Sequence, residues 1–186
     1  MFRLISVSFV LALALPVGAM AAVWNMRPAE SRITITATQQ GANFTGQFKK
    51  FDTEIKFDPK DLAQSSVTAT IDTGSFDSQS SDRDSEVKSS DWFDIAKFPV
   101  AKFQTKSFKD LGGGKYQAVA DLTIRNMTKE VVLPFTLAIN GKVAKMTGSL
   151  SLLRTDYGVG QGQWTSTDWV GGDVKVDIAL TADQAD

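Results

Sequence analysis

The chain contains no cysteine and no histidine among its 186 residues. Without cysteine it forms no disulfide, so its core alone must hold the fold. Zinc and copper sites built on imidazole or thiolate are excluded, as are catalytic triads and general bases that use histidine. An oxygen-ligand calcium site stays open, although no D-x-D-x-D-G loop is present. We therefore expect no metal site and no enzyme.

The chain also lacks a strong charge of either sign. Its formal net charge is −1, and no run of five like charges occurs. Nucleic acids and anionic membrane surfaces both require a concentrated basic face, so neither is an expected partner. With 42% hydrophobic and 22% charged residues, the composition is that of a soluble globular protein with one domain and a proper core.

Residues 1–21 have the pattern of a signal peptide. Arg3 supplies the positive start, an apolar run follows from Leu4 to Leu15, and the small-x-small pattern at residues 19–21 is typical of a signal peptidase site. We expect cleavage after Ala21 or Ala22 and export to the periplasm. The alternative is an uncleaved membrane anchor, but the apolar run is short for a bilayer span.

The mature chain, residues 22–186, is predicted to be a single all-β domain. Apolar and polar residues alternate with period two in most of its segments. The expected strands are 32–38, 43–51, 53–57, 66–71, 100–109, 115–124, 128–139, 142–153 and 173–180. Tight turns such as Asn140-Gly141 join consecutive strands. This favours an antiparallel up-and-down β-barrel of about eight strands, and a β-sandwich is the alternative.

One long insert, residues 71–105, interrupts the strands. Ser80 or Ser81 is a candidate helix cap, and the acidic residues that follow suit the first turns of a helix. We expect this helix to end near Ser90 or Asp91. In a closed barrel the insert would lie across an open end, with residues 80–99 forming a lid or rim.

Aromatic and small residues share the predicted inward positions. The aromatic set is Phe44, Phe48, Phe51, Phe57, Phe103, Phe135, Trp164 and Trp169. The small set is Gly46, Ala69, Ala101, Ala118, Ala120, Ala144 and Gly148. The aromatic side chains could simply fill the barrel, but the small residues leave space that favours an apolar cavity.

Four motifs in chain order resemble the YceI-like family. They are G-x-F-x-x-F with I-x-F-D-P at residues 46–59, R-D with D-W-F-D and K-F-P at 83–99, L-T-I-R-N-x-T-K at 122–129, and R-T-D-Y-G-V-G at 154–160. The resemblance implies a lipocalin-like barrel, often a homodimer, that encloses a polyisoprenoid chain such as a polyprenol or a quinone tail. No cofactor other than such a bound isoprenoid lipid is implied.

The sequence departs from the family pattern near the start of the barrel. Gln39 or Gln40 stands where many members have a histidine. Gln-Gln-Gly at this point is similar to members encoded or fused with b-type membrane cytochromes. The alternative function is therefore a periplasmic partner of a membrane cytochrome b in quinone-linked redox or stress response.

The resemblance and the aromatic pattern together give a set of candidate ligand-binding residues. These are Phe44, Phe48, Phe51, Arg83, Asp84, Trp92, Phe93, Phe98, Phe103, Arg154, Tyr157 and Trp164. Arg83 with Asp84 suits either a polar head group or a buried pair that fixes the insert, and we favour the pair. Arg154 with Asp156 is expected to stabilise a turn. Asp91 and Asp94 suggest an acid–base pair, but helix capping explains both carboxylates.

Overall fold

The computed structural model describes residues 21–186, so the expected signal peptide and its cleavage site lie outside the described residues. The chain forms β1 (Val23–Met26), β2 (Arg32–Gln39), β3 (Ala42–Phe48), β4 (Phe51–Lys56), β5 (Ser66–Asp72), β6 (Phe76–Asp77), α1 (Ser81–Glu86), β7 (Val100–Gly112), β8 (Lys115–Ile124), β9 (Met127–Asn140), β10 (Val143–Leu153) and β11 (Asp173–Gln184). Among the described residues no helix has the length and hydrophobicity needed to span a bilayer.

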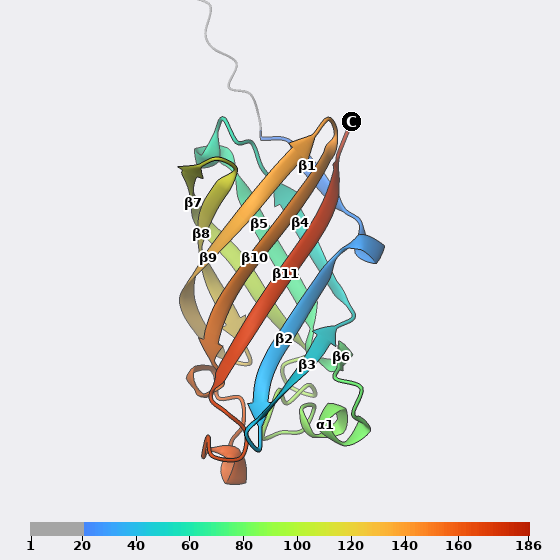
Figure 1. Ribbon diagram of the computed structural model, residues 1–186, viewed down its shortest axis with the longest axis vertical. Coiled ribbons are helices and arrows are strands. Elements are labelled where there is room, and N and C mark those ends of the chain that lie inside the picture. Colours follow the sequence, from blue (N-terminus) through green and yellow to red (C-terminus); the bar gives the residue numbers. More distant parts are fainter. Residues whose placement is uncertain (1–20) are drawn as a thin grey trace, which may run out of the picture.

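The strands close into an antiparallel barrel (Figure 1). The ring runs β1-β4-β5-β7-β8-β9-β10-β11, and β11 returns to pair with β1. Strand β2 continues β1 after the short turn Pro28–Glu30, and both pair with β11. Strand β3 likewise precedes β4, and β6 continues β5. The predicted barrel of about eight strands is therefore confirmed, with three of its strands interrupted once.

The strand predictions hold for most of the chain, with three corrections. Val23–Met26 was not expected to be a strand, because four residues show too little alternation to be read. The segment 43–51 is not one strand, because β3 ends at Phe48 and β4 begins at Phe51. The last strand continues to Gln184 and so provides the surface that closes the ring against β1.

An ion pair crosses the seam where the ring closes. The Arg27 guanidinium contacts both carboxylate oxygens of Asp183, with Nε to Oδ2 at 2.8 Å and Nη2 to Oδ1 at 2.6 Å. The hydrogen bonds from Arg27 lower the pKa of the Asp183 carboxyl. Because the pair is solvent exposed, it fixes the register of the seam rather than supplying much stability.

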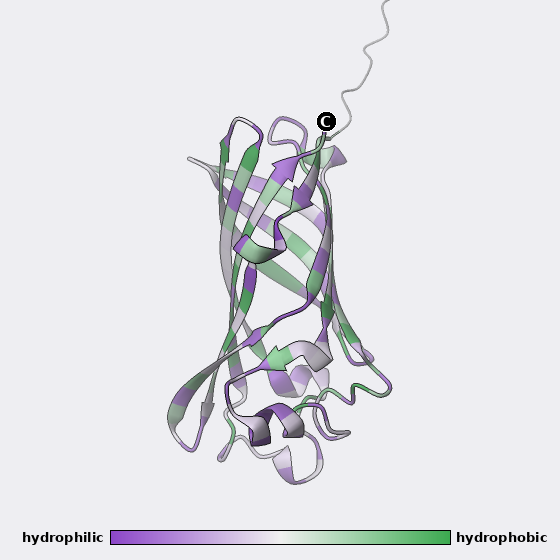
Figure 2. Ribbon diagram, turned by 90° about the vertical axis from the view of Figure 1, so that its right-hand side faces the viewer, coloured by the Kyte–Doolittle hydropathy of each residue, from purple (hydrophilic) through white to green (hydrophobic). Residues whose placement is uncertain are grey.

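Figure 2 shows hydrophobic and hydrophilic residues alternating along the strands. In β8 the even-numbered positions from Tyr116 to Leu122 are buried, whereas the odd-numbered positions are only partly buried. In β9 Val131, Leu133 and Phe135 are buried, and the residues between them are exposed. This is the period-two pattern of a sheet with one face turned to the interior of a barrel.

The insert lies across one end of the barrel, as predicted, and its helix α1 is at the lower end in Figure 1. The helix is shorter than predicted, because it ends at Glu86 rather than near Ser90 or Asp91. Beyond it the backbone turns tightly, with Lys88 N donating to Ser85 O and Ser89 N to Glu86 O. Serine is a poor residue for a helix interior, which favours these turns over further helix.

The opposite end of the barrel is packed by a layer of aromatic rings. Phe57 lies 5.2 Å from Phe108 and 5.7 Å from Tyr116, measured between ring centroids. Tyr116 in turn stacks on Phe135 at 5.4 Å. Trp24 extends the layer, and its indole Nε1 donates to Phe57 O at 3.0 Å. Pairs at these distances and inclinations suit the quadrupoles of the rings, so this layer closes the barrel.

Gly46 is not a vacant position, contrary to what its small size suggested. A Cβ built on Gly46 would lie 2.3 Å from Cζ of Phe76, whose side chain is buried. The Phe76 ring therefore occupies the space beside this glycine. Gly148 is also tightly covered, because a Cβ there would lie 3.0 Å from Pro134 O. Ala69 and Ala101, in contrast, do border open space.

We predict that Gly46→Ala lowers the free energy of unfolding by about 1–3 kcal/mol, because the new methyl group forces the buried Phe76 ring to move. Urea denaturation of the mature protein measures this change. The double variant Gly46→Ala/Phe76→Leu should recover part of the loss, since a smaller side chain leaves space for the methyl group. Strictly additive losses would contradict the close contact between these two residues.

Candidate functional site

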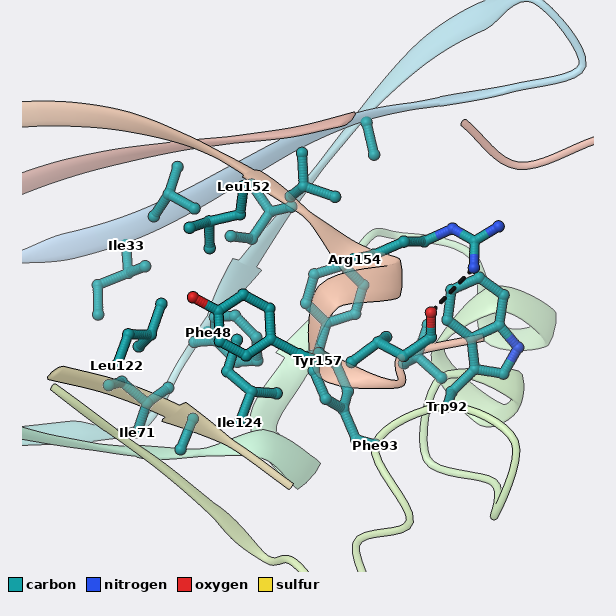
Figure 3. Close-up of a pocket in the computed structure, with 18 of the residues that line it drawn as sticks. Ile33, Phe48, Ile71, Trp92, Phe93, Leu122, Ile124, Leu152, Arg154 and Tyr157 are labelled. Atoms are coloured by element: carbon teal, nitrogen blue, oxygen red, sulfur yellow. Dashed lines mark hydrogen bonds between the residues drawn. The ribbon is translucent and has the colours of Figure 1, made fainter. Parts of the chain in front are cut away.

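A cavity of about 630 Å³ occupies the half of the barrel next to the insert. Figure 3 shows its wall, with side chains from several strands and from the end loops pointing inward. Most of these side chains are aliphatic or aromatic. A volume of this size falls within the range of 300–1,000 Å³ that is usual for small-molecule sites. The predicted hollow interior is therefore present, and most of its volume lies in this half of the barrel.

Ten of the twelve candidate residues line this cavity. They are Phe44, Phe48, Phe51, Arg83, Trp92, Phe93, Phe103, Arg154, Tyr157 and Trp164. The other two, Asp84 and Phe98, do not belong to the wall. Trp169 is also outside it, because its side chain is 55% exposed on a loop. The structure thus gathers most of the set around one space, and their contact with a ligand stays a prediction.

Aliphatic residues make up a large part of the wall and were not among the candidates. They include Ile33, Ile35, Ile71, Leu122, Ile124, Leu150, Leu152, Val174, Val176 and Ile178. Their signal was present in the sequence, because they occupy the inward phase of the strands predicted there. Nothing in a single strand shows, however, how far along the barrel axis a residue lies. Inward residues of the cavity and of the aromatic layer therefore look alike in the sequence.

Arg83 connects the insert to the tip of the β2–β3 hairpin. Its Nε and Nη2 both donate to Gln39 Oε1 at 3.1 Å, and its guanidinium carbon lies 4.0 Å from the centre of the Phe44 ring. Its Nη1 donates to Ser78 Oγ at 3.1 Å, and that hydroxyl donates to Asp84 Oδ1 at 2.6 Å. Arg83 and Asp84 are therefore linked through Ser78, and the expected direct buried pair is not formed.

The rim of the cavity is the polar part of its wall. Asp82, Arg83 and Glu86 of α1 line it together with Gln39 and Ser80. Asp82 is exposed and the other residues are partly buried. Gln39, which stands near the position of the family's histidine, is thus a rim residue whose side-chain oxygen is engaged by Arg83. We infer that this end of the barrel is the entrance.

Two further contacts hold the insert in place. Arg125, in the β8–β9 turn, donates from Nη1 to Ser90 O at 2.9 Å and also to Trp92 O. The backbone carbonyl of Asp91 accepts from the amides of Gly160 and Gln161 at 2.9 and 2.7 Å. Sequence reasoning missed Arg125, whose only signal was its place within a family motif. These bonds use the polar backbone of the insert and leave Trp92 turned toward the cavity.

The Asp94 carboxylate is held by cations rather than poised for acid–base chemistry. Its Oδ2 lies 3.2 Å from Lys97 Nζ and 3.9 Å from Arg125 Nη2, and its side chain is 7% exposed. The Asp91 carboxylate lies against Gly162 instead. A Cβ built on Gly162 would be 3.0 Å from Asp91 Oδ2. The two aspartates therefore serve different loops, and the expected helix capping by their carboxylates is wrong, because α1 is Ser81–Glu86 and neither aspartate flanks it.

Arg154 is bound entirely by backbone carbonyl groups of the loop that follows it. Its guanidinium donates to six carbonyl oxygens at 2.8–3.4 Å, those of Val159, Gly160, Trp164, Ser166, Val170 and Gly171. Among residues 21–186 it has no acidic partner, so the expected pair with Asp156, an exposed residue, is not formed. Burial lowers the pKa of this guanidinium. Arg154 therefore shapes the loop at the barrel entrance and has no free donor.

Gly160 allows this arrangement. A Cβ there would lie 2.0 Å from Arg154 Nη1, and the backbone φ angle of +85° is one that glycine adopts without strain.

A second, smaller cavity of about 80 Å³ lies toward the aromatic layer. Val67, Phe103, Leu133, Met146 and Leu180 line both cavities. These five side chains form a partition between the two spaces. The interior is therefore a cup that narrows toward its closed end, rather than a tunnel open at both ends.

We predict that Arg154→Lys lowers the free energy of unfolding by about 2–3 kcal/mol, because a lysine offers three donors in place of a planar fork and leaves buried carbonyl groups unpaired. Thermal and urea unfolding measure the loss, and limited proteolysis should show faster cleavage within residues 158–172. Arg32→Lys, at an exposed position, is the matched control. Equal stability of Arg154→Lys and the wild-type protein would contradict the role given to the six carbonyl contacts.

Comparison with known proteins places this site in a family. The model of the YceI-like domain matches residues 24–182. A UPF0312 protein of Vibrio parahaemolyticus is 34% identical over 133 residues, which is 70% of each chain. A UPF0312 protein of Vibrio cholerae is 30% identical over 165 residues, covering 84% of this chain and 87% of the relative.

Solved structures agree with this assignment. BcnA of Burkholderia cenocepacia superimposes with a TM-score of 0.81 at 34% identity, covering 84% of this chain and 99% of that one. A polyisoprenoid-binding domain of Saccharophagus degradans has a TM-score of 0.70 at 15% identity, covering 90% of this chain and all of that one, and shows the shared fold. By sequence and by structure, this chain belongs to the YceI-like family.

Proposed function

We propose that this protein is an exported, periplasmic carrier that encloses an isoprenoid chain in the cup of its barrel. The observation that carries the proposal is the apolar cavity of about 630 Å³ beneath the insert. At roughly 30 Å³ for each water-sized group, it has room for about 20 carbon atoms. Burial of these carbons at ~0.8 kcal/mol each contributes about 16 kcal/mol before the cost of ordering the chain.

Two further observations support a lipid over a polar metabolite. The charged side chains of the wall lie at the rim, except Arg154, whose donors are occupied by carbonyl groups. The structurally similar domain from Saccharophagus degradans is described as polyisoprenoid binding. A polyprenol or a quinone tail fits both the shape and the chemistry of this wall.

A second candidate function is docking on a membrane redox protein such as a b-type cytochrome. Trp169 is 55% exposed, and its backbone carbonyl accepts a hydrogen bond from Gln40 N at the tip of the β2–β3 hairpin. A large exposed aromatic side chain beside the cavity entrance suits contact with a protein or a membrane surface. In this case the cavity would be secondary to the contact surface.

Native mass spectrometry of the protein purified from its own host separates the two functions. A carrier should retain a lipid of defined mass that dissociates on activation in the gas phase. A docking subunit should appear without lipid and should co-purify with the membrane cytochrome. Absence of any retained lipid, together with failure to bind added isoprenoids, would refute the carrier.

We predict that Phe48→Ala and Trp92→Ala each lower lipid occupancy while the protein stays folded, because both remove aromatic surface from the cavity wall. Phe108→Ala is the matched control, since Phe108 belongs to the aromatic layer at the closed end and lines only the smaller cavity. Occupancy is measured by native mass spectrometry and folding by circular dichroism. Unchanged occupancy in both folded variants would remove these residues from the binding wall.

We predict that Arg83→Met accelerates release of bound all-trans-retinol, a fluorescent isoprenoid, several-fold. The substitution removes the two hydrogen bonds that tie the insert to Gln39 and the one that Arg83 makes to Ser78 within the insert. Stopped-flow fluorescence measures the release rate. Lys88→Met is the matched control, because this lysine belongs to the same segment and its side chain makes no hydrogen bond or ion pair with residues 21–186. Equal release rates in Arg83→Met and the wild-type protein would show that the rim does not control exit.

A further inference from the structure

Tyr157 places a hydroxyl group inside the apolar cavity. The residue ends the short helix η4 (Arg154–Tyr157), and its side chain is 2% exposed. In Figure 3 its ring reaches into the cavity and the hydroxyl points toward the part of the wall that contains Ile33 and Leu122, away from the Arg154 guanidinium. None of the side-chain hydrogen bonds among residues 21–186 includes this hydroxyl.

The surroundings of the hydroxyl are apolar. Ile33, Ile71, Leu122 and Leu152 are labelled around it in Figure 3, and none of them offers a side-chain partner. Burial raises the pKa of the Tyr157 hydroxyl, with a smaller contribution from Asp156. The hydroxyl is not among the fully covered polar atoms, and no described side-chain hydrogen bond includes it, so it is free to pair with a molecule in the cavity. A ligand atom that pairs with it gains a hydrogen bond inside an apolar space.

The charge distribution restricts what that ligand atom is. Besides Arg83 of α1, Arg154 is the only cation of the described wall, and its donors already bind six carbonyl groups. An anionic head group such as a phosphate would therefore meet no free cation beside Tyr157, and its transfer into this aliphatic space would be very costly. An uncharged acceptor or donor meets no such penalty.

We propose that the Tyr157 hydroxyl binds an uncharged polar group of the isoprenoid ligand, a ketone or quinone carbonyl, an amide or an alcohol, and holds it inside the barrel. This inference rests on the proposed carrier function. It assigns the ligand an orientation, with its polar group within the cup rather than among the charged residues of the rim. The inference also restricts the chemical class of the ligand, because the charged head group of a polyprenyl phosphate is not an uncharged partner for Tyr157.

Thr53 provides a matched control. It also lines the cavity, and its Oγ1 has no hydrogen-bond partner among the described residues, but neighbouring atoms cover that oxygen completely. The Tyr157 hydroxyl is not among such covered atoms. A ligand in the cavity can therefore reach the hydroxyl of Tyr157 but not that of Thr53. Thr53→Val and Tyr157→Phe each delete one inward hydroxyl and keep most of the side chain.

The experiment uses farnesylacetone, an isoprenoid ketone, labelled with ¹³C at its carbonyl, and the matched hydrocarbon in which a methylene replaces the carbonyl. Isotope-edited infrared spectroscopy measures the carbonyl stretch of the bound ketone. In the wild-type protein and in Thr53→Val we expect a lower frequency than in an alkane solvent, because a hydrogen bond weakens the C=O bond. In Tyr157→Phe we expect the frequency found in alkane.

Affinities provide the second measurement. Tyr157→Phe should weaken binding of the ketone about three- to tenfold and leave binding of the hydrocarbon unchanged, since one hydrogen bond is lost. An unshifted carbonyl in the wild-type protein, or a shift that survives in Tyr157→Phe, overturns this inference and leaves the carrier function standing. An unshifted wild-type spectrum overturns the inference even if the variant does not fold. Failure of the wild-type protein to bind either probe overturns both.

Discussion

The ring of hydrogen-bonded strands is the constraint on which the rest of the structure depends. Once β11 pairs with β1, the circumference is fixed by the strand number, and the interior has a set width. Inward side chains then either fill that width or leave it open. Near the closed end, rings such as Phe57 and Phe135 meet across the axis, whereas in the other half aliphatic and aromatic side chains form a wall around a vacant centre.

Polar contacts of three arginines hold the loops around the entrance. Arg154 and Arg125 both bind backbone carbonyl groups, so the loops are held by their main chain and their apolar side chains stay free to face inward. Arg83 has the same role between α1 and Gln39. Arginine suits these positions because its planar fork satisfies several acceptors at once. Three cations thus support a site whose inner wall is apolar.

Much of this fold was predictable from the sequence, because period-two alternation reports which residues of a strand point inward. The height of a residue along the barrel axis was not predictable, since it depends on the register between strands. For this reason the space beside Gly46 was expected to be open, although Phe76 from β6 fills it. Trp169 was misplaced for a related reason, because its loop has no alternation to read.

Under the proposed carrier function, the hollow interior also links the stability of the protein to its ligand. Wall residues such as Ile33 and Leu122 pack in hydrophobic clusters and also border the open space at the centre. A chain that fills the cup adds contacts to these side chains and binds only the folded state. Such a ligand stabilises the fold by about 2.7 kcal/mol when its concentration is 100 times its dissociation constant. For the proposed carrier, the loaded barrel is therefore the more stable form.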